Sequence, residues 1–153
     1  MTKHAQSIWR VLTLLFVLAV LPGLTSAAEC AGTTEESLRC HSDEVRDLLR
    51  DWVRAWGTGD IDTYLGLYNS IRSPRDDMNR SDWVQNRRER VTPDRPAEIN
   101  LKLESMGLED SGIFDVVFRQ QYRSPSYQDE VRKRLFLLHE GDELKIWKEE
   151  VLP

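Results

Sequence analysis

The stretch IFDVVFRQQYRSPSYQDEVRKRLFLL, residues 113–138, holds two runs of alternating residues on either side of a Ser-Pro-Ser turn. Alternate residues of a β-strand project from the same face. One face of the two predicted strands therefore carries Phe114, Val116, Phe118, Gln120 and Tyr122, then Val131, Lys133, Leu135 and Leu137. An amide, a phenol and an amine lie at one end of this otherwise apolar face, and this pattern is typical of a half-closed pocket.

Helical periodicity precedes this hairpin. Ser42 is the expected N-cap of a first helix, because Asp43 and Glu44 follow it at the positive end of the helix dipole. Gly57 is placed for the left-handed residue that ends this helix, and Asp60 is placed to cap a second, shorter one. The first helix has one apolar stripe, formed by Val45, Leu48, Leu49, Trp52, Val53 and Trp56.

A third helix is expected to begin at Ser81 or Asp82 and to end in the cationic run Arg87, Arg88 and Arg90. Cations at the C-terminal end of a helix complement its dipole. We interpret this run as a solvated helix end, and a basic recognition patch is the alternative interpretation.

Beyond the helices, apolar residues recur at every second position instead of every third or fourth. Ile99, Leu101 and Leu103 alternate with polar residues and predict a strand with one solvated face. Turn residues at 109–112 and 140–143 separate this strand, the opening hairpin and a last strand over 144–152. Helices followed by strands joined through short hairpins predict an α+β domain with an antiparallel sheet.

Residues 1–28 have the pattern of a secretory signal peptide. Lys3 and Arg10 precede the apolar run Val11–Leu21, and small residues suit cleavage after Ala27 or Ala28. An uncleaved N-terminal anchor is the alternative, although the run is short for a membrane span. We therefore expect a periplasmic or secreted protein, with no stable membrane insertion once the leader is cleaved.

The charge of the chain argues against nucleic-acid binding. The 153 residues, enough for a single domain, include 21 basic and 26 acidic side chains. Removing a leader that holds two of the basic residues and none of the acidic ones leaves a net charge of −7. Nucleic acids and anionic membranes both favour a dominant positive field, which this chain lacks.

Both cysteines, Cys30 and Cys40, fall in a polar segment over residues 29–41 that we interpret as a tether to a domain over 42–153. In an exported protein, two cysteines ten residues apart favour one disulfide that closes a small loop. Cross-linking to a partner and two free thiols are the alternatives. The spacing is not that of a C-x-x-C redox motif.

The chain resembles the nuclear transport factor 2-like (SnoaL-like) superfamily, and within it an exported module found at the C-terminus of some bacterial L,D-transpeptidases. The resemblance covers roughly residues 43–150, with Leu144 where the module has Trp. In the helices it rests on Trp52, Trp56, Asp60, Tyr64, Tyr68, Trp83 and Arg87. In the sheet it rests on Phe118, Gln120, Tyr122, Ser124, Tyr127, Asp129, Lys133, Leu135, Leu137, Ile146 and Glu149.

This resemblance implies a cone of three N-terminal helices packed on a curved, mainly antiparallel four-stranded sheet. It also implies an accessory module, since the sequence has no nucleophile motif of the transpeptidase type. The tryptophans of the helices are expected to be core residues, because they fall on apolar faces.

The candidate pocket for a ligand consists of Phe118, Gln120, Tyr122, Lys133, Glu149 and Tyr64. A Lys133–Glu149 ion pair is expected to be structural, with ligand binding and acid–base chemistry as alternatives. His41 and His139 are interpreted as surface histidines, so we expect no metal site, no cofactor and no catalytic residue.

Three functions fit these observations. The first is an exported, non-enzymatic binding module that serves cell-envelope or peptidoglycan-processing proteins. The second is a small-molecule-binding protein, or an isomerase- or cyclase-like enzyme, that uses the pocket. The third is a structural homodimer formed through the sheet face, where Trp147 is expected to be partly exposed.

Overall fold

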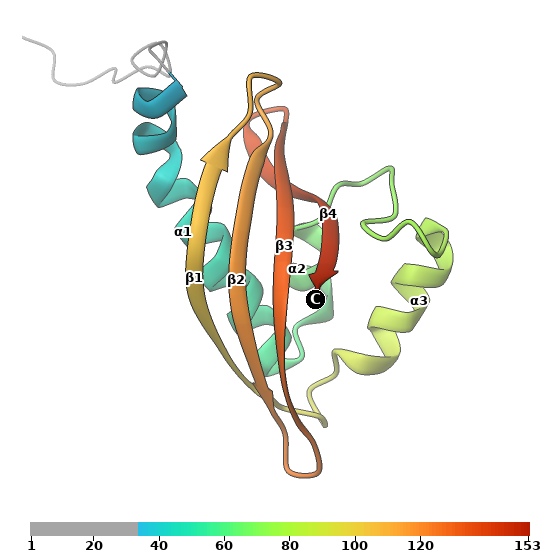
Figure 1. Ribbon diagram of the computed structural model, residues 1–153. Helices are drawn as coiled ribbons and strands as arrows, with labels where there is room; N and C mark the ends of the chain where they lie inside the picture. Colours follow the sequence, from blue (N-terminus) through green and yellow to red (C-terminus); the bar gives the residue numbers. More distant parts are fainter. Residues whose placement is uncertain (1–33) are drawn as a thin grey trace, which may run out of the picture.

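The computed structural model describes residues 34–153 of the chain. The helices of this part are α1 (Thr34–Thr58), α2 (Ile61–Gly66) and α3 (Arg80–Arg90). The strands are β1 (Glu98–Leu108), β2 (Phe114–Arg123), β3 (Gln128–Glu140) and β4 (Glu143–Leu152). Helices precede strands in the chain, which confirms the predicted α+β order (Figure 1).

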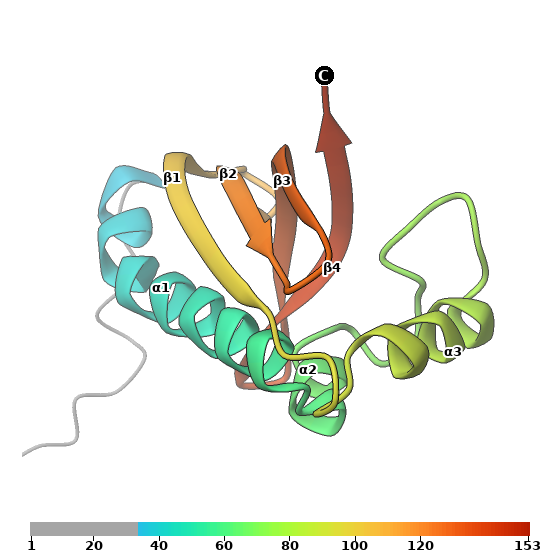
Figure 2. The same cartoon turned by 90° about the horizontal axis from the view of Figure 1, so that it is seen from below.

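The four strands form one antiparallel sheet in the order β1-β2-β3-β4. Seen along the strands, the sheet curves, α1 and α2 lie against one face, and α3 stands beyond the β4 edge (Figure 2). In the central hairpin, Phe118 pairs with Lys133 and Gln120 pairs with Val131. The two alternating sets of residues therefore share the face that packs on the helices, as their period predicts.

A β-bulge in the outer hairpin decides which residues of β4 face the core. Leu137 pairs with Ile146 whereas Phe136 pairs with Lys148, so Trp147 is an extra residue on β4. Without it, Ile146 and Glu149 would project from opposite faces, because they are three residues apart. With it, both side chains are buried on the inner face.

The beginning of α1 differs from the sequence-based expectation. The helix starts at Thr34, so the interpretation of residues 34–41 as a tether and of Ser42 as an N-cap is wrong. The Ser42 hydroxyl donates to the carbonyl of Arg39, one turn back, instead of capping free amides. Leu38 packs against the core and gives this polar first part of the helix an apolar contact.

The left-handed residue after α1 is Gly59, with φ +75°, and not Gly57 as predicted. Asp60 caps α2 as predicted, since its side chain accepts a hydrogen bond from the Thr63 amide. The α3 helix begins at Arg80, one or two residues before the predicted start at Ser81 or Asp82, because Asn79 caps it by accepting from the Asp82 amide.

The core lies between the helices and the inner face of the sheet. Trp52 and Trp83 are fully buried, as their positions on apolar helix faces predict, while Trp56 is partly exposed. Backbone hydrogen bonds join the end of α2 to β4, from the Ile146 amide to the Leu67 carbonyl and from the Asn69 amide to the Ile146 carbonyl. This junction fixes Tyr68 beside the inner face of the sheet.

Two predictions lie outside the described residues. The leader over residues 1–28 is one, and the pairing of Cys30 with Cys40 is the other because Cys30 is not described. Among residues 34–153, no helix is long and apolar enough to cross a membrane.

Candidate functional site

An open cleft of about 460 Å³ lies between α3 and the inner face of the sheet, toward the β2–β3 turn. It brings together residues from the end of α1, from α3, from the loops on both sides of α3 and from strands β2 to β4. The cleft is lined by Trp56, Arg75, Arg87, Arg90, Arg95, Gln120, Tyr122, Tyr127, Asp129, Val131, Lys133, Glu149 and Val151.

The cleft contains four of the six residues predicted for the pocket. Gln120, Tyr122, Lys133 and Glu149 line it. Phe118 and Tyr64 do not, because both are fully buried in the core.

The floor of the cleft is an ion pair between β3 and β4. Lys133 Nζ lies 2.5 Å from Glu149 Oε1, and both side chains are less than a tenth exposed. The amine also lies 5.4 Å from the ring centroid of Trp56 and 5.7 Å from that of Trp52. Two aromatic faces and one carboxylate therefore compensate the buried positive charge.

A directed hydrogen-bond network holds the other oxygen of Glu149. Tyr68 donates to Glu149 Oε2 over 3.1 Å and accepts from Trp52 Nε1 over 2.8 Å. The Tyr64 and Tyr68 hydroxyls lie 2.9 Å apart. Since Tyr68 gives its one hydrogen to the carboxylate, Tyr64 is the donor in that contact.

This network fixes the charge of Glu149. Burial alone would raise the pKa of Glu149, but the charges of Lys133 and Arg87 and the hydrogen bonds from Lys133 and Tyr68 hold it below its usual value of 4.5. Burial raises the pKa of Tyr68 well above 10.0, so this phenol stays protonated. Glu149 is thus an ionised carboxylate with both oxygens bonded, and it is poorly suited to act as a general base near neutral pH.

Two buried polar atoms of the lining residues are left unpaired. Arg87 Nε, a donor, and Gln120 Oε1, an acceptor, make no hydrogen bond within the described part of the chain. Arg87 is 8% exposed and Gln120 is 4% exposed. Buried polar groups are rarely left without partners, but both atoms are shielded from solvent, so a ligand reaches them only if the lining of the cleft shifts.

Four arginines, Arg75, Arg87, Arg90 and Arg95, form what we call the arginine collar of the cleft. Arg75 is paired with Asp77 through two hydrogen bonds. The other three form no ion pair within residues 34–153. With Lys133, the lining has five cations against two acids, Asp129 and Glu149, in a chain whose formal net charge is −5.

The collar corrects the interpretation of the cationic run on α3. Arg88 is an exposed side chain that contacts Asp62, as expected for a solvated helix end. Arg87 is buried with its guanidinium 5.6 Å from the Trp83 ring centroid, and Arg90 lines the cleft. Arg75 and Arg95 come from loops without periodicity, so no signal in the sequence connects them to α3.

An aromatic wall borders the collar. Trp56 lies 5.8 Å from Tyr122, and Tyr122 lies 6.1 Å from Tyr127, between ring centroids. Tyr127 is 59% exposed at the β2–β3 turn. The cleft thus offers an aromatic surface of tilted rings beside its cations, and no serine, cysteine or histidine is among the residues that line it.

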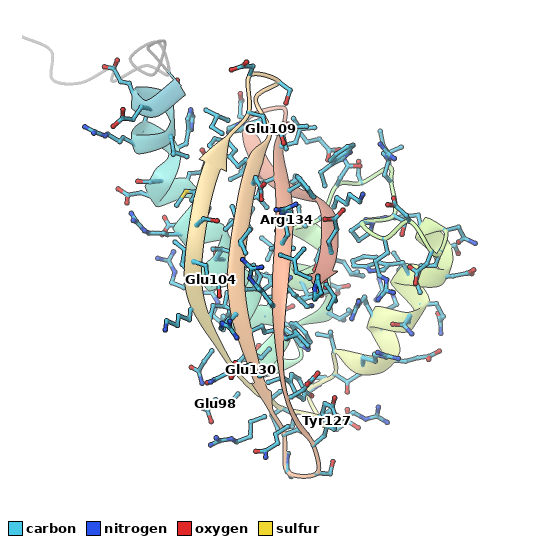
Figure 3. All side chains as sticks on the ribbon, in the orientation of Figure 1. Glu98, Glu104, Glu109, Tyr127, Glu130 and Arg134 are labelled. Atoms are coloured by element: carbon cyan, nitrogen blue, oxygen red, sulfur yellow. The ribbon has the colours of Figure 1, made fainter. Side chains whose placement is uncertain are left out.

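The opposite face of the sheet is charged. Glu104 accepts hydrogen bonds from Arg119 and Arg132, and Arg134 is paired with Asp115. Figure 3 shows Glu104, Glu130 and Arg134 on the sheet face turned away from α1. Trp147 is partly buried, with the Arg72 guanidinium 4.9 Å from its ring centroid. Dimerisation through this face stays a prediction.

The helices on a curved antiparallel sheet, with a cleft at one end, define an α+β domain of the nuclear transport factor 2 (NTF2)-like class. The chain belongs to the Cds6 C-terminal NTF2-like domain family, whose model matches residues 44–150. This confirms the superfamily that the sequence resembles. The NTF2-like fold supports a ligand-binding or enzyme-like domain. No curated protein matches the chain.

Solved structures share the fold. Bd1075 of Bdellovibrio bacteriovorus matches with a TM-score of 0.63 and 22% identity, over 80% of this chain and 43% of that one. An NTF2-like protein of unknown function from Shewanella oneidensis MR-1 matches with a TM-score of 0.61 and 16% identity, over 72% and 97%.

The helical cell shape determining protein Pgp2 of Campylobacter jejuni, as a K307A mutant, matches with a TM-score of 0.57 and 22% identity, over 71% of this chain and 40% of that one. The chain thus spans less than half the length of Bd1075 and of Pgp2. At these identities the likeness concerns the fold alone.

Proposed function

We propose that this protein is an exported, non-enzymatic binding module of the cell envelope, whose cleft takes a peptide with a free carboxylate. The arginine collar carries this proposal, because Arg87, Arg90 and Arg95 have no acidic partner within residues 34–153. The cleft sets these cations beside the Gln120 amide, so a fitting ligand offers an anionic acceptor together with an N–H group. A peptide terminus combines a carboxylate with an adjacent amide N–H.

The arginine collar supports the anionic part of this ligand. Guanidinium groups bind carboxylates through two parallel hydrogen bonds, and such charge-assisted bonds are stronger than neutral ones. Arg90 and Arg95 stand at the cleft without an acidic partner among the described residues. The aromatic wall of Trp56, Tyr122 and Tyr127 supports the apolar part of the ligand.

The envelope location rests on two arguments. The leader pattern of residues 1–28 favours export, and among proteins of the same fold one is described as a helical cell shape determining protein. Peptides with free carboxylates are a normal component of bacterial cell walls. A cell-wall peptide, or an acidic segment of a protein that processes it, is therefore the ligand we expect.

The state of the two acids in the cleft favours binding over catalysis, because Asp129 is exposed to solvent and Glu149 is buried in an ion pair. Asp129 and Glu149 are the acids of the cleft, and Glu149 is neutralised by Lys133. An isomerase- or cyclase-like enzyme that used this cleft would need either the solvent-exposed Asp129 as its base or Glu149 released from Lys133. That alternative predicts turnover of a small substrate that is lost in Asp129→Asn or in Glu149→Gln, whereas the binding module has no turnover to lose.

The collar allows a matched test on one helix. Arg90→Ala removes a cation of the cleft, and Arg88→Ala removes a cation that points to Asp62 instead. In a sedimentation assay with purified peptidoglycan, we expect Arg90→Ala and Arg95→Ala to reduce the bound fraction strongly and Arg88→Ala to leave it unchanged. Equal losses in all three variants would indicate non-specific charge attraction, and no binding by the unaltered protein would reject the proposed ligand.

A further inference from the structure

A second cluster of polar side chains lies where the first part of α1 meets the end of β3. His41 Nδ1 is 2.9 Å from Glu44 Oε2, and His139 Nε2 is 3.0 Å from Glu44 Oε1. The two imidazoles thus converge on one carboxylate, although His139 is 95 residues from Glu44 in the chain. Both histidines are partly exposed at the surface, as interpreted from the sequence, but they share one carboxylate, which the sequence does not indicate.

The cluster has the composition of a metal site. One ligand atom from each of the three residues can be chosen so that all lie within 4.8 Å of one another. Zinc is bound by histidine nitrogen and carboxylate oxygen at about 2.0–2.2 Å, so tetrahedral ligands are about 3.4 Å apart. Each of the three side chains is about one-third exposed, so an ion can reach the cluster, and binding requires the ligand atoms to move closer together.

The packing around the cluster presets its geometry. The Phe114 ring lies 5.6 Å from the His41 ring and 6.2 Å from the His139 ring, with both pairs edge to face. The two imidazole rings are 5.4 Å apart. Because Phe114 is buried in β2, it forms a fixed apolar base against which both imidazoles rest.

We propose that His41, Glu44 and His139 bind one divalent transition-metal ion, with zinc the best fit to the two imidazoles and one carboxylate. His41 supplies Nδ1, His139 supplies Nε2, and Glu44 supplies one oxygen. A fourth position faces solvent, where water completes the coordination. The ion joins α1 to β3 through ligands that are 95 residues apart in the chain, Glu44 and His139. It therefore stabilises the folded state as a cross-link does.

This site is separate from the arginine collar. None of its three residues lines the cleft, and it lies at the other end of β3, beside the turn that leads to β4. Metal binding at the cluster and peptide binding at the cleft are therefore independent proposals, and failure of one leaves the other standing.

The test uses the full chain prepared without a polyhistidine tag. Calorimetric titration with zinc chloride is expected to show one ion per chain, and the zinc-bound protein to have a higher Tm. His139→Ala, His41→Ala and Glu44→Gln should each weaken zinc binding by more than about tenfold, the lower bound for loss of a supporting residue at a metal site. Asp43→Asn is the matched control, because Asp43 is an exposed neighbour that pairs with Arg46.

A second measurement guards against variants that fail to fold. Histidine ring signals in two-dimensional NMR of the unaltered protein should shift on zinc addition, at Nδ1 of His41 and Nε2 of His139. Cobalt substitution should give the intense visible absorption of a four-coordinate ion. Unshifted ring signals, or zinc affinity that is the same in His139→Ala and the unaltered protein, would overturn the proposal and leave a hydrogen-bonded triad without metal.

Discussion

Lys133 of β3 and Glu149 of β4 form an ion pair that is buried beneath the cleft, with Nζ 2.5 Å from Oε1. The two residues come within reach because Leu135 pairs with Glu149 across the strands and a bulge turns Glu149 inward. The pair separates an aromatic core, which contains Tyr68, from a solvated cleft with the arginine collar. It makes Glu149 a fixed charge of the fold and leaves the collar to attract an anion.

Lys133→Met is expected to lower the free energy of unfolding by about 3–5 kcal/mol, because it leaves Glu149 buried without its partner. Urea unfolding followed by circular dichroism measures this loss. Lys133→Met combined with Glu149→Met should recover much of the stability, since neither charge is then buried alone. Arg39→Met, which breaks an exposed pair with Glu35, is the control and should cost less than about 1 kcal/mol. A Lys133→Met variant as stable as the control would contradict the structural role of the pair.

Glu149 also predicts how stability depends on pH. The pKa of Glu149 in the folded state is below the usual 4.5. Its contribution to the stability of the fold is therefore complete above about pH 4.5 and is lost as the pH falls through the folded-state pKa. Glu104 and Glu140 have lowered pKa values as well and act in the same direction. The comparison with Glu149→Gln isolates the buried group: the variant should be less stable at pH 7 and lose less stability between pH 5 and pH 3. Parallel pH profiles would show that Glu149 does not titrate differently on folding.

Tyr68→Phe removes the donor to Glu149 and the acceptor for Trp52 and Tyr64. Because three buried groups lose a partner, we expect a loss of about 1–3 kcal/mol or more. Tyr64→Phe removes one hydrogen bond and should cost less. Thermal unfolding of both variants and of the double variant gives the coupling between them. Additive losses would argue against a directed network.

Gly59→Ala tests the junction between α1 and α2. Gly59 has φ +75°, and a Cβ there would lie 2.1 Å from the carbonyl carbon of Thr92, so both strain and a backbone clash are expected. Gly112 has φ +82° with open space around it, and Gly112→Ala controls for the strain alone. We expect a much larger fall in Tm for Gly59→Ala. Equal falls in Tm for the two variants would mean that the backbone at Thr92 moves away from the added methyl group at little energetic cost.

The sequence predicted the fold well where local periodicity determines it. The alternation in residues 113–138 predicts the inner face of the hairpin, and the Lys133–Glu149 pair follows from placing both residues in the sheet. The start of α1 was missed because residues 34–41 are mostly polar, with Leu38 as the main apolar contact. Helix formation there depends on a tertiary contact that propensity does not describe.

The candidate site was predicted only in part, for a related reason. Gln120, Tyr122 and Lys133 share one face of the central hairpin, and the period of a strand is readable from sequence, whereas Glu149 joins that face through a bulge in β4 that no period predicts. Arg75 and Arg95 reach the cleft from irregular loops, and His41 meets His139 through Glu44 across most of the domain. Contacts of this kind depend on how the chain returns on itself, which no local pattern records.

The central claim is that the cleft recognises a free carboxylate. Calorimetric titration with N-acetyl-D-alanyl-D-alanine and with its C-terminal amide measures this most directly, because the two ligands differ at the carboxylate alone. Charge-assisted hydrogen bonds contribute about 1.5–3 kcal/mol, so the acid should bind at least about tenfold more tightly than the amide. That preference should disappear in Arg90→Ala combined with Arg95→Ala. Equal affinity for the acid and the amide in the unaltered protein would contradict the claim.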